Sequence, residues 1–113
     1  NGECKYSNPK TGLFIKKAHF TPDEVSVGDY LVLSTSIVNN GEVDWKDMRV
    51  TVLIYELGVK IAGKEFNLDS GEQHNQNLFF QLPGETEPGQ YLAEITVGNS
   101  NLHETAYREV TVN

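Results

Sequence analysis

Residues 30–56, YLVLSTSIVNNGEVDWKDMRVTVLIYE, contain two runs of alternating apolar residues separated by an Asn-Asn-Gly sequence. Successive side chains of a β-strand point to opposite faces of the sheet, so each run, 30–38 and 48–56, can present one apolar face to a core. Asn and Gly tolerate positive φ, which makes residues 39–41 a strong turn signal. The stretch therefore predicts two β-strands joined by a turn and a polar connection.

The same pattern recurs outward from these two strands along the chain. Five further β-rich runs are separated by turn-forming residues, at 13–20, 59–66, 74–82, 90–97 and 102–112. Nothing amphipathic follows TPDEVSVGD, residues 21–29, so we expect a loop there. Short strands with regular turn signals and no convincing helix are typical of an all-β fold, an immunoglobulin-like β-sandwich of about seven antiparallel strands. We assign this sandwich to residues 13–113.

The core of the sandwich is predicted from the parity of its apolar residues. Burying each such side chain contributes ~1.5–3 kcal/mol, which makes a core plausible without a disulfide, and Cys4 is the only cysteine. Residues 1–12 are rich in Gly, Asn and Pro and lack periodicity, so we expect a flexible leader or linker. The predicted core rows are Leu31, Leu33, Thr35, Ile37, Met48, Val50, Val52, Ile54, Leu78, Phe80, Leu82, Tyr91, Ala93, Ile95 and Val97.

Charge and apolar content argue against two kinds of partner. The net charge of −7 disfavours nucleic acid and anionic membrane surfaces, because both require a positive patch. No apolar run approaches the ~18 residues that span a bilayer, so we expect no membrane insertion by this segment. The chain starts without an apolar signal-peptide core, and we expect any targeting signal or anchor to lie outside it.

Tyr91 is predicted to have a structural role near the start of the run at 90–97. It follows a Pro-Gly turn in EPGQYLAEITV, which resembles the tyrosine corner of Greek-key sandwiches, where the Tyr hydroxyl bonds to nearby backbone. Antibody domains carry a Cys two residues later, and here that position is Ala93. The resemblance is therefore to a sandwich that lacks the inter-sheet disulfide.

Three sequence segments together carry a resemblance to a known family. These are VGDYLVLSTSIVNNGEVDWKDMRVTVLIYELGVKI (27–61), LDSGEQ (68–73) and PGQYLAEITV (88–97), in that order. They resemble the cell-adhesion-related domain found in bacteria, the CARDB domain, over residues 13–112. The resemblance implies a prokaryotic surface immunoglobulin-like module that is secreted or displayed at the cell surface, often beside sister domains. It carries over no catalytic residue.

Four large side chains are left over on the sheet face opposite the core rows: Leu53, Tyr55, Leu92 and Tyr107. In an immunoglobulin-like strand order their three strands are neighbours in one sheet, so the four residues would form an apolar patch. Such patches usually mark a partner. We expect a contact face for protein or for a neighbouring domain, unless the leader covers it. A bulge in the last run would instead turn Tyr107 inward.

The connection EVDW offers an alternative function. Trp45 could stack on a sugar ring, which would make the protein a carbohydrate-binding module. Glu42, Asp44 and Asp47 could supply oxygen ligands to calcium, although the spacing of a dedicated calcium loop is absent. The competing interpretation is a plain strand connection in which Trp45 covers one end of the sandwich.

Signatures of catalysis are missing from the sequence. It has no G-x-S-x-G elbow and no Cys–His nucleophile pair in a supporting context. The three histidines, His19, His74 and His103, fall on separate runs without the short spacing of zinc ligands. We therefore expect no enzyme and no cofactor.

Overall fold

The structure is a computed structural model that describes residues 12–113. The predicted leader thus lies, apart from Gly12, outside the described residues. A short 3-10 helix, η1 (Tyr55–Leu57), follows the fourth of the strands. The strands are β1 (Leu13–Thr21), β2 (Glu24–Val25), β3 (Tyr30–Asn39), β4 (Trp45–Ile54), β5 (Val59–Ala62), β6 (Phe66–Leu68), β7 (Gln73–Gln81), β8 (Gly89–Gly98) and β9 (His103–Val112).

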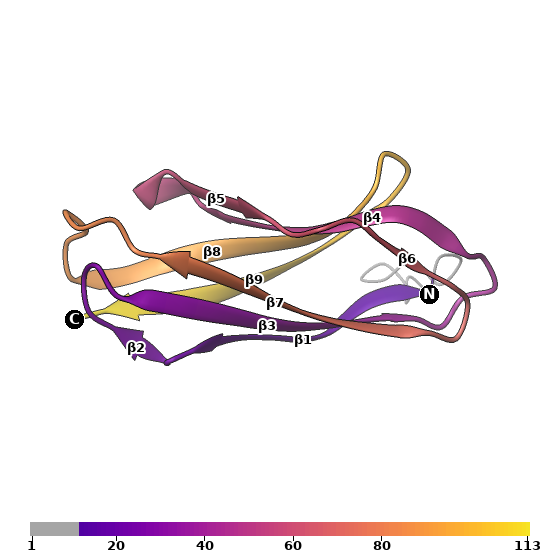
Figure 1. Ribbon diagram of the computed structural model, residues 1–113, viewed down its shortest axis with the longest axis horizontal. Helices are drawn as coiled ribbons and strands as arrows, with labels where there is room; N and C mark the ends of the chain where they lie inside the picture. The colour runs from indigo at the N-terminus through magenta and orange to yellow at the C-terminus, as the bar shows by residue number, and fades with distance from the viewer. Residues whose placement is uncertain (1–11) are drawn as a thin grey trace, which may run out of the picture.

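The strands form two packed sheets that run along the long axis of the molecule (Figure 1). One sheet has the order β1-β3-β7, and the other has the order β2-β9-β8-β4-β5, with β6 paired to the start of β4. The predicted all-β sandwich is confirmed. All the strand pairs are antiparallel except β2 with β9, a parallel pair of two residues that was not among the expected strands.

The described residues contain more strands than the seven expected, for two reasons. The run at 59–66 divides into β5 and β6 because residues 63–65 form no strand, although the Gly63 N–H still donates to the Val50 carbonyl of β4 at 2.8 Å. A Cβ on Gly63 would lie 2.7 Å from the Gln76 side chain, so the chain passes there without room for a larger residue. The expected loop at 21–29 contains β2, whose two residues pair with the end of β9.

The predicted core rows lie between the sheets. All their residues are buried except Tyr91, which is only partly buried at the rim. Thr35 is the only polar residue among the buried members of these rows. Its Oγ1 donates to the Gln76 carbonyl at 2.8 Å. A buried hydroxyl without a partner would destabilise the core, so this bond explains how Thr35 occupies an inward position.

Tyr91 makes the hydrogen bond of a tyrosine corner. Its hydroxyl donates to the carbonyl oxygen of Glu87 at 2.6 Å, which ties the start of β8 to the turn before it.

Replacing Tyr91 with Phe removes this bond and keeps the ring. We expect the free energy of unfolding to fall by about 0.5–1.5 kcal/mol, the net contribution of one intramolecular hydrogen bond. Urea denaturation of the variant measures the change. Tyr30→Phe is the matched control, because its ring is largely exposed. Equal effects of the two substitutions would contradict a structural role for the Tyr91 hydroxyl.

Candidate functional site

The leftover side chains of the sequence pattern come together on the outer face of the larger sheet. Leu53 of β4 pairs with Glu94 of β8, which pairs with Tyr107 of β9, so these strands are neighbours as expected. The register of β8 with β9 shows no shift. The bulge that would have turned Tyr107 inward is therefore absent from this pair, and Tyr107 stays on the outer face.

Three of the four predicted residues surround a shallow cavity of about 250 Å³ on this face. Tyr55, Leu92 and Tyr107 are 69%, 52% and 55% exposed, which is unusual for three neighbouring large apolar residues. Leu53 is only partly exposed and lies outside the lining of this cavity. We call Tyr55, Leu92 and Tyr107 the sheet-face patch.

Acidic side chains border the sheet-face patch. The Tyr55 hydroxyl donates to Glu94 Oε1 at 2.7 Å, and Glu56 lies in the same cavity wall. This hydrogen bond to Glu94 raises the pKa of Tyr55 above its ordinary value, because the carboxylate favours the protonated phenol. The cavity therefore offers apolar rings beside negative charge, and the Glu94 bond holds the Tyr55 ring in place.

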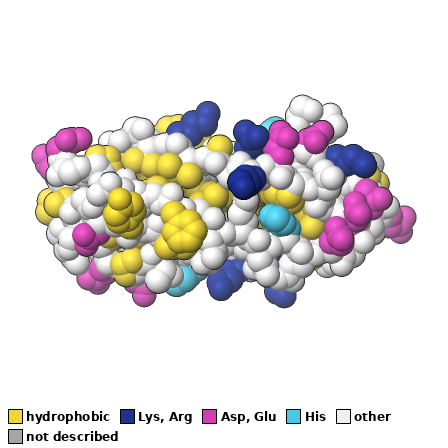
Figure 2. Space-filling view, viewed as in Figure 1, with side chains coloured by type: hydrophobic (Ala, Val, Ile, Leu, Met, Phe, Trp, Pro, Cys, Tyr) yellow, Lys and Arg dark blue, Asp and Glu magenta, His cyan; other side chains and the backbone are white. Residues whose placement is uncertain are grey.

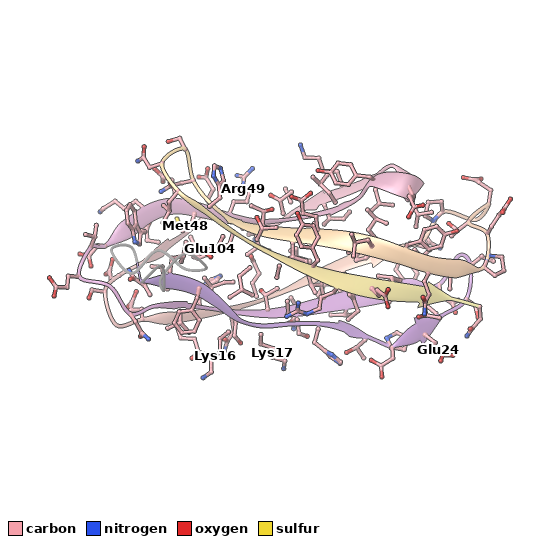
Figure 3. All side chains as sticks on the ribbon, turned by 180° about the vertical axis from the view of Figure 1, so that it is seen from behind. Lys16, Lys17, Glu24, Met48, Arg49 and Glu104 are labelled. Carbon is pink, nitrogen blue, oxygen red and sulfur yellow. The ribbon has the colours of Figure 1, made fainter. Side chains whose placement is uncertain are left out.

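A second and larger hollow lies at the end of the sandwich where β4 begins. It has a volume of about 620 Å³. Arg49, next to the buried Met48, is labelled at this end in Figure 3. We call this hollow the end cleft. Its lining consists of Asp44, Trp45, Lys46, Asp47, Arg49, Glu65, Gly98, Asn99, Ser100 and Asn101.

The position of Trp45 corrects the sequence interpretation. It is the first residue of β4 rather than part of the connection, because it pairs with Leu68 of β6. The register then shifts between Trp45 and Met48, and Asp47 has a positive φ of 59°. Trp45 is partly buried and packs against the core, yet it also contributes to the cleft wall.

The opposite wall of the end cleft comes from the turn between β8 and β9, which sequence reasoning missed. Asn99 holds the two walls together, since its Nδ2 donates to the Lys46 carbonyl at 2.9 Å. Its Oδ1 accepts from the backbone N–H groups of Asn101 and Leu102. The only sign of this wall in the sequence was the segment GNSN (98–101), which is typical of an ordinary turn.

The three acidic residues of the calcium alternative do not gather around one point. Asp44 Oδ1 accepts a hydrogen bond from the Ser70 N–H at 2.8 Å, and Glu42 lies outside the cleft lining. Among residues 12–113 there is no group of three or more His, Cys, Asp or Glu residues arranged to hold a metal ion.

The histidine of β7 is an internal packing residue. His74 stacks on Phe66 of β6 with ring centroids 3.8 Å apart and an interplanar angle of 7°. Its Nε2 is buried without a hydrogen-bond partner among the described residues. Burial lowers the pKa of His74 below its ordinary value, because the charged ring loses solvation.

The lowered pKa of His74 predicts a loss of stability in mild acid. The unfolded chain takes up the proton first as pH falls, so His74 contributes full stability above about pH 6.5, the ordinary histidine value, and less below it. Thermal unfolding of the protein and of His74→Phe, followed from pH 7.5 to 5, measures this contribution as a difference. We expect the wild-type protein to lose more thermal stability than His74→Phe as pH falls. Equal losses in the two proteins would contradict the account.

Comparison with known proteins gives a match of fold. No protein-family model matches the sequence, and no curated protein matches it. The CARDB domain of PF1109 from Pyrococcus furiosus superposes with a TM-score of 0.68 at 21% identity, over 93% of this chain and 97% of that one. A structure of the same domain in complex with di-metal ions gives 0.64 at 21% identity, over 96% and 97%. The predicted resemblance to a CARDB domain is thus confirmed as a fold.

A larger protein contains a similar domain. The alkylpurine DNA glycosylase AlkC of Pseudomonas fluorescens, bound to DNA containing an abasic site analog, superposes with a TM-score of 0.67 at 16% identity. The match covers 91% of this chain, which spans about a third (31%) of the AlkC chain. Within residues 12–113, no helix is long and apolar enough to cross a bilayer.

Proposed function

We propose that this protein is a non-catalytic structural or adhesion module of a secreted or cell-surface protein. It binds another protein, or a neighbouring domain of its own chain, through the sheet-face patch. The observation that carries the proposal is the cavity of about 250 Å³ surrounded by Tyr55, Leu92 and Tyr107. Exposed aromatic residues around a small pocket are the features that concentrate binding energy at protein interfaces.

The chemistry of the patch defines what it would bind. One apolar side chain of a partner fills the cavity, and a Lys or Arg beside it faces Glu56 and Glu94. The net charge of −7 also favours a basic partner, because long-range attraction speeds association. The remaining support is the likeness of fold to the CARDB domain, a module of about the same length.

The proposal is tested with a displayed library of short peptides selected on the protein. We expect the enriched peptides to combine an aromatic or aliphatic residue with a neighbouring Lys or Arg. Leu92→Glu should weaken their binding at least about 30-fold, the effect of losing a hot-spot residue. Thr105→Glu is the matched control, because Thr105 is exposed on the same strand face as Tyr107. Peptides that bind both variants equally would overturn the proposal.

A carbohydrate-binding function of the end cleft is the second candidate. The favouring observation is that Trp45, Asp44, Asn99 and Arg49 line one open cleft of about 620 Å³. Trp45 is the only tryptophan, so its fluorescence reports directly on this cleft. Calcium and then a panel of polysaccharides are added separately. A saturable shift with one polysaccharide would establish the sugar site, and an unresponsive emission would exclude stacking on Trp45.

A further inference from the structure

We propose that two copies of this chain pair through the free edge of β7 and form a continuous sheet of six strands. Strand β7 pairs with β3 on one side, and no other strand of residues 12–113 pairs with its other side. In Figure 1 β7 runs between β3 of its own sheet and β5 of the other sheet. The partner in this proposal is a second copy of this chain. It binds to the smaller sheet, whereas the sheet-face patch lies on the larger one.

The backbone groups that face the free edge are identified by the hydrogen bonds that flank β7. The Asn39 N–H donates to the Glu72 carbonyl and the Leu82 N–H donates to the Asp29 carbonyl, both at 3.0 Å and both in the register of the β3–β7 pair. Bonded residues alternate in an antiparallel ladder, so even-numbered residues of β7 bond to β3. The N–H and C=O groups of Gln73, Asn75, Asn77, Phe79 and Gln81 therefore point outward.

Three other edge strands, β1, β2 and β5, carry features that discourage pairing, and β7 does not. On β1 the register shifts between Ile15 and Lys17, and Arg108 Nε of β9 donates to the Ala18 carbonyl at 2.9 Å. Strands β2 and β5 have only 2 and 4 residues. Natural proteins shorten, bend or charge their edges in these ways to prevent association. By contrast β7 has 9 residues and an unbroken register.

The composition of β7 favours a second copy as the occupant. The chain has a net charge of −7, yet residues 73–84 contain no Asp, Glu, Lys or Arg. The strand itself therefore places no like charges opposite each other when two copies approach along this edge, and the cations Arg49 and Lys64 lie beside it in the neighbouring groove. Phe79, 68% exposed, adds apolar surface. Hydrophobic side chains gather over the part of this face where β7 ends, while Lys and Arg lie over the middle (Figure 2).

Symmetry then selects one register. Two β7 strands around a two-fold axis run antiparallel, as isologous pairing requires. All five outward-facing residues of each copy find partners only when Asn77 faces Asn77 of the second copy, which puts Asn75 opposite Phe79 and Gln73 opposite Gln81. A groove of about 530 Å³ beside the edge, whose lining includes the apolar Ile61, Leu78 and Phe79 and the cations Arg49 and Lys64, would be closed by the second copy.

Disulfide trapping tests this register. In a Cys4→Ser background, Asn77→Cys places two thiols across the axis, where the expected Cα separation of ~5.5 Å lies within the range of a disulfide. We expect rapid intermolecular cross-linking under mild oxidation. Asn75→Cys is the matched control, because it lies on the same exposed row but faces Phe79 of the second copy. Equal cross-linking of the two variants would overturn the proposed register.

Sedimentation equilibrium tests the association itself. We expect a concentration-dependent dimer that tightens with added salt, because salt screens the repulsion of two chains of charge −7. Asn77→Lys should raise the dissociation constant at least ~10-fold, since two lysines would face each other. His19→Lys, on β1 at the other edge of the sheet, should leave it unchanged.

A wild-type protein that stays monomeric at every concentration overturns the proposal. Hydrogen exchange of the Asn77 and Phe79 amides then identifies what covers the edge. Fast exchange means a bare edge, whereas slow exchange in a monomer means that another part of the same chain pairs there. If the edge instead binds a strand of a different protein, the free chain stays monomeric and its binding to that protein weakens with added salt.

Discussion

Replacing Asn39 with Ala is expected to lower the free energy of unfolding by about 3 kcal/mol or more. Asn39 is fully buried at the end of β3. Its Nδ2 donates to the carbonyls of Val43 and Leu68 at 2.8 and 3.0 Å, and its Oδ1 accepts from the Gly41 N–H at 2.9 Å. The substitution leaves these three backbone groups without their partner. The bond to the Leu68 carbonyl is buried, where an unsatisfied group costs about 1–3 kcal/mol, and the other two bonds are partly buried.

The neighbouring residue provides the control for Asn39. Asn40 is exposed, and the structure uses its backbone N–H, which donates to the Gly12 carbonyl at 2.9 Å. Asn40→Ala should therefore change the free energy of unfolding by less than about 0.5 kcal/mol. Urea denaturation of both variants, with the slope against denaturant checked for constancy, measures the difference. A loss below about 1 kcal/mol for Asn39→Ala would contradict its role in joining the turn to β6.

Replacing Phe80 with Ala is expected to have an effect of similar size, about 3–5 kcal/mol. Phe80 is 5% exposed and lies between the sheets on β7, where its ring meets Phe20 of β1 edge to face at 6.1 Å between centroids. Removing the ring loses its transfer free energy and leaves a cavity that the surrounding strands fill only in part.

The adjacent Phe79 tests the alternation that underlies the whole fold. It points to the opposite face of the same strand and is largely exposed, so Phe79→Ala should lower the free energy of unfolding by less than about 1 kcal/mol. Denaturation is measured in dilute protein, where association through β7 contributes little. A larger loss for Phe79→Ala than for Phe80→Ala would mean that β7 is shifted by one residue.

Most of the core could be predicted from the sequence because strand parity is a local property. Predicting the core rows on β3, β4, β7 and β8 required only the alternation of apolar residues. No tertiary contact reversed the faces that this alternation assigns. Two features depended on distant contacts. The break between β5 and β6 arises where Gly63 packs against Gln76, and β2 exists because its two residues meet the end of β9. Neither contact leaves a periodic signal in its own segment.

The candidate sites differ in how far sequence reasoning reached. Leu92 and Tyr107 of the sheet-face patch followed from parity together with the strand order of an immunoglobulin-like fold. Tyr55 joins them from η1 rather than from the predicted strand. The end cleft could not be predicted from the sequence, because Asn99 reaches Lys46 across a separation of 53 residues. Trp45 was assigned to the connection since acidic residues and a turn signal surround it. Its place in β4 depends on pairing with Leu68 of β6.

The measurement that tests the central claim most directly is the footprint of the tightest selected peptide on the protein, mapped by changes in backbone amide NMR shifts. The account predicts saturable changes centred on Tyr55, Leu92, Glu94 and Tyr107, which are lost in Leu92→Glu and kept in Thr105→Glu. Changes confined to Trp45, Lys46 and Asn99 would contradict it, and would make the end cleft the binding site of this protein.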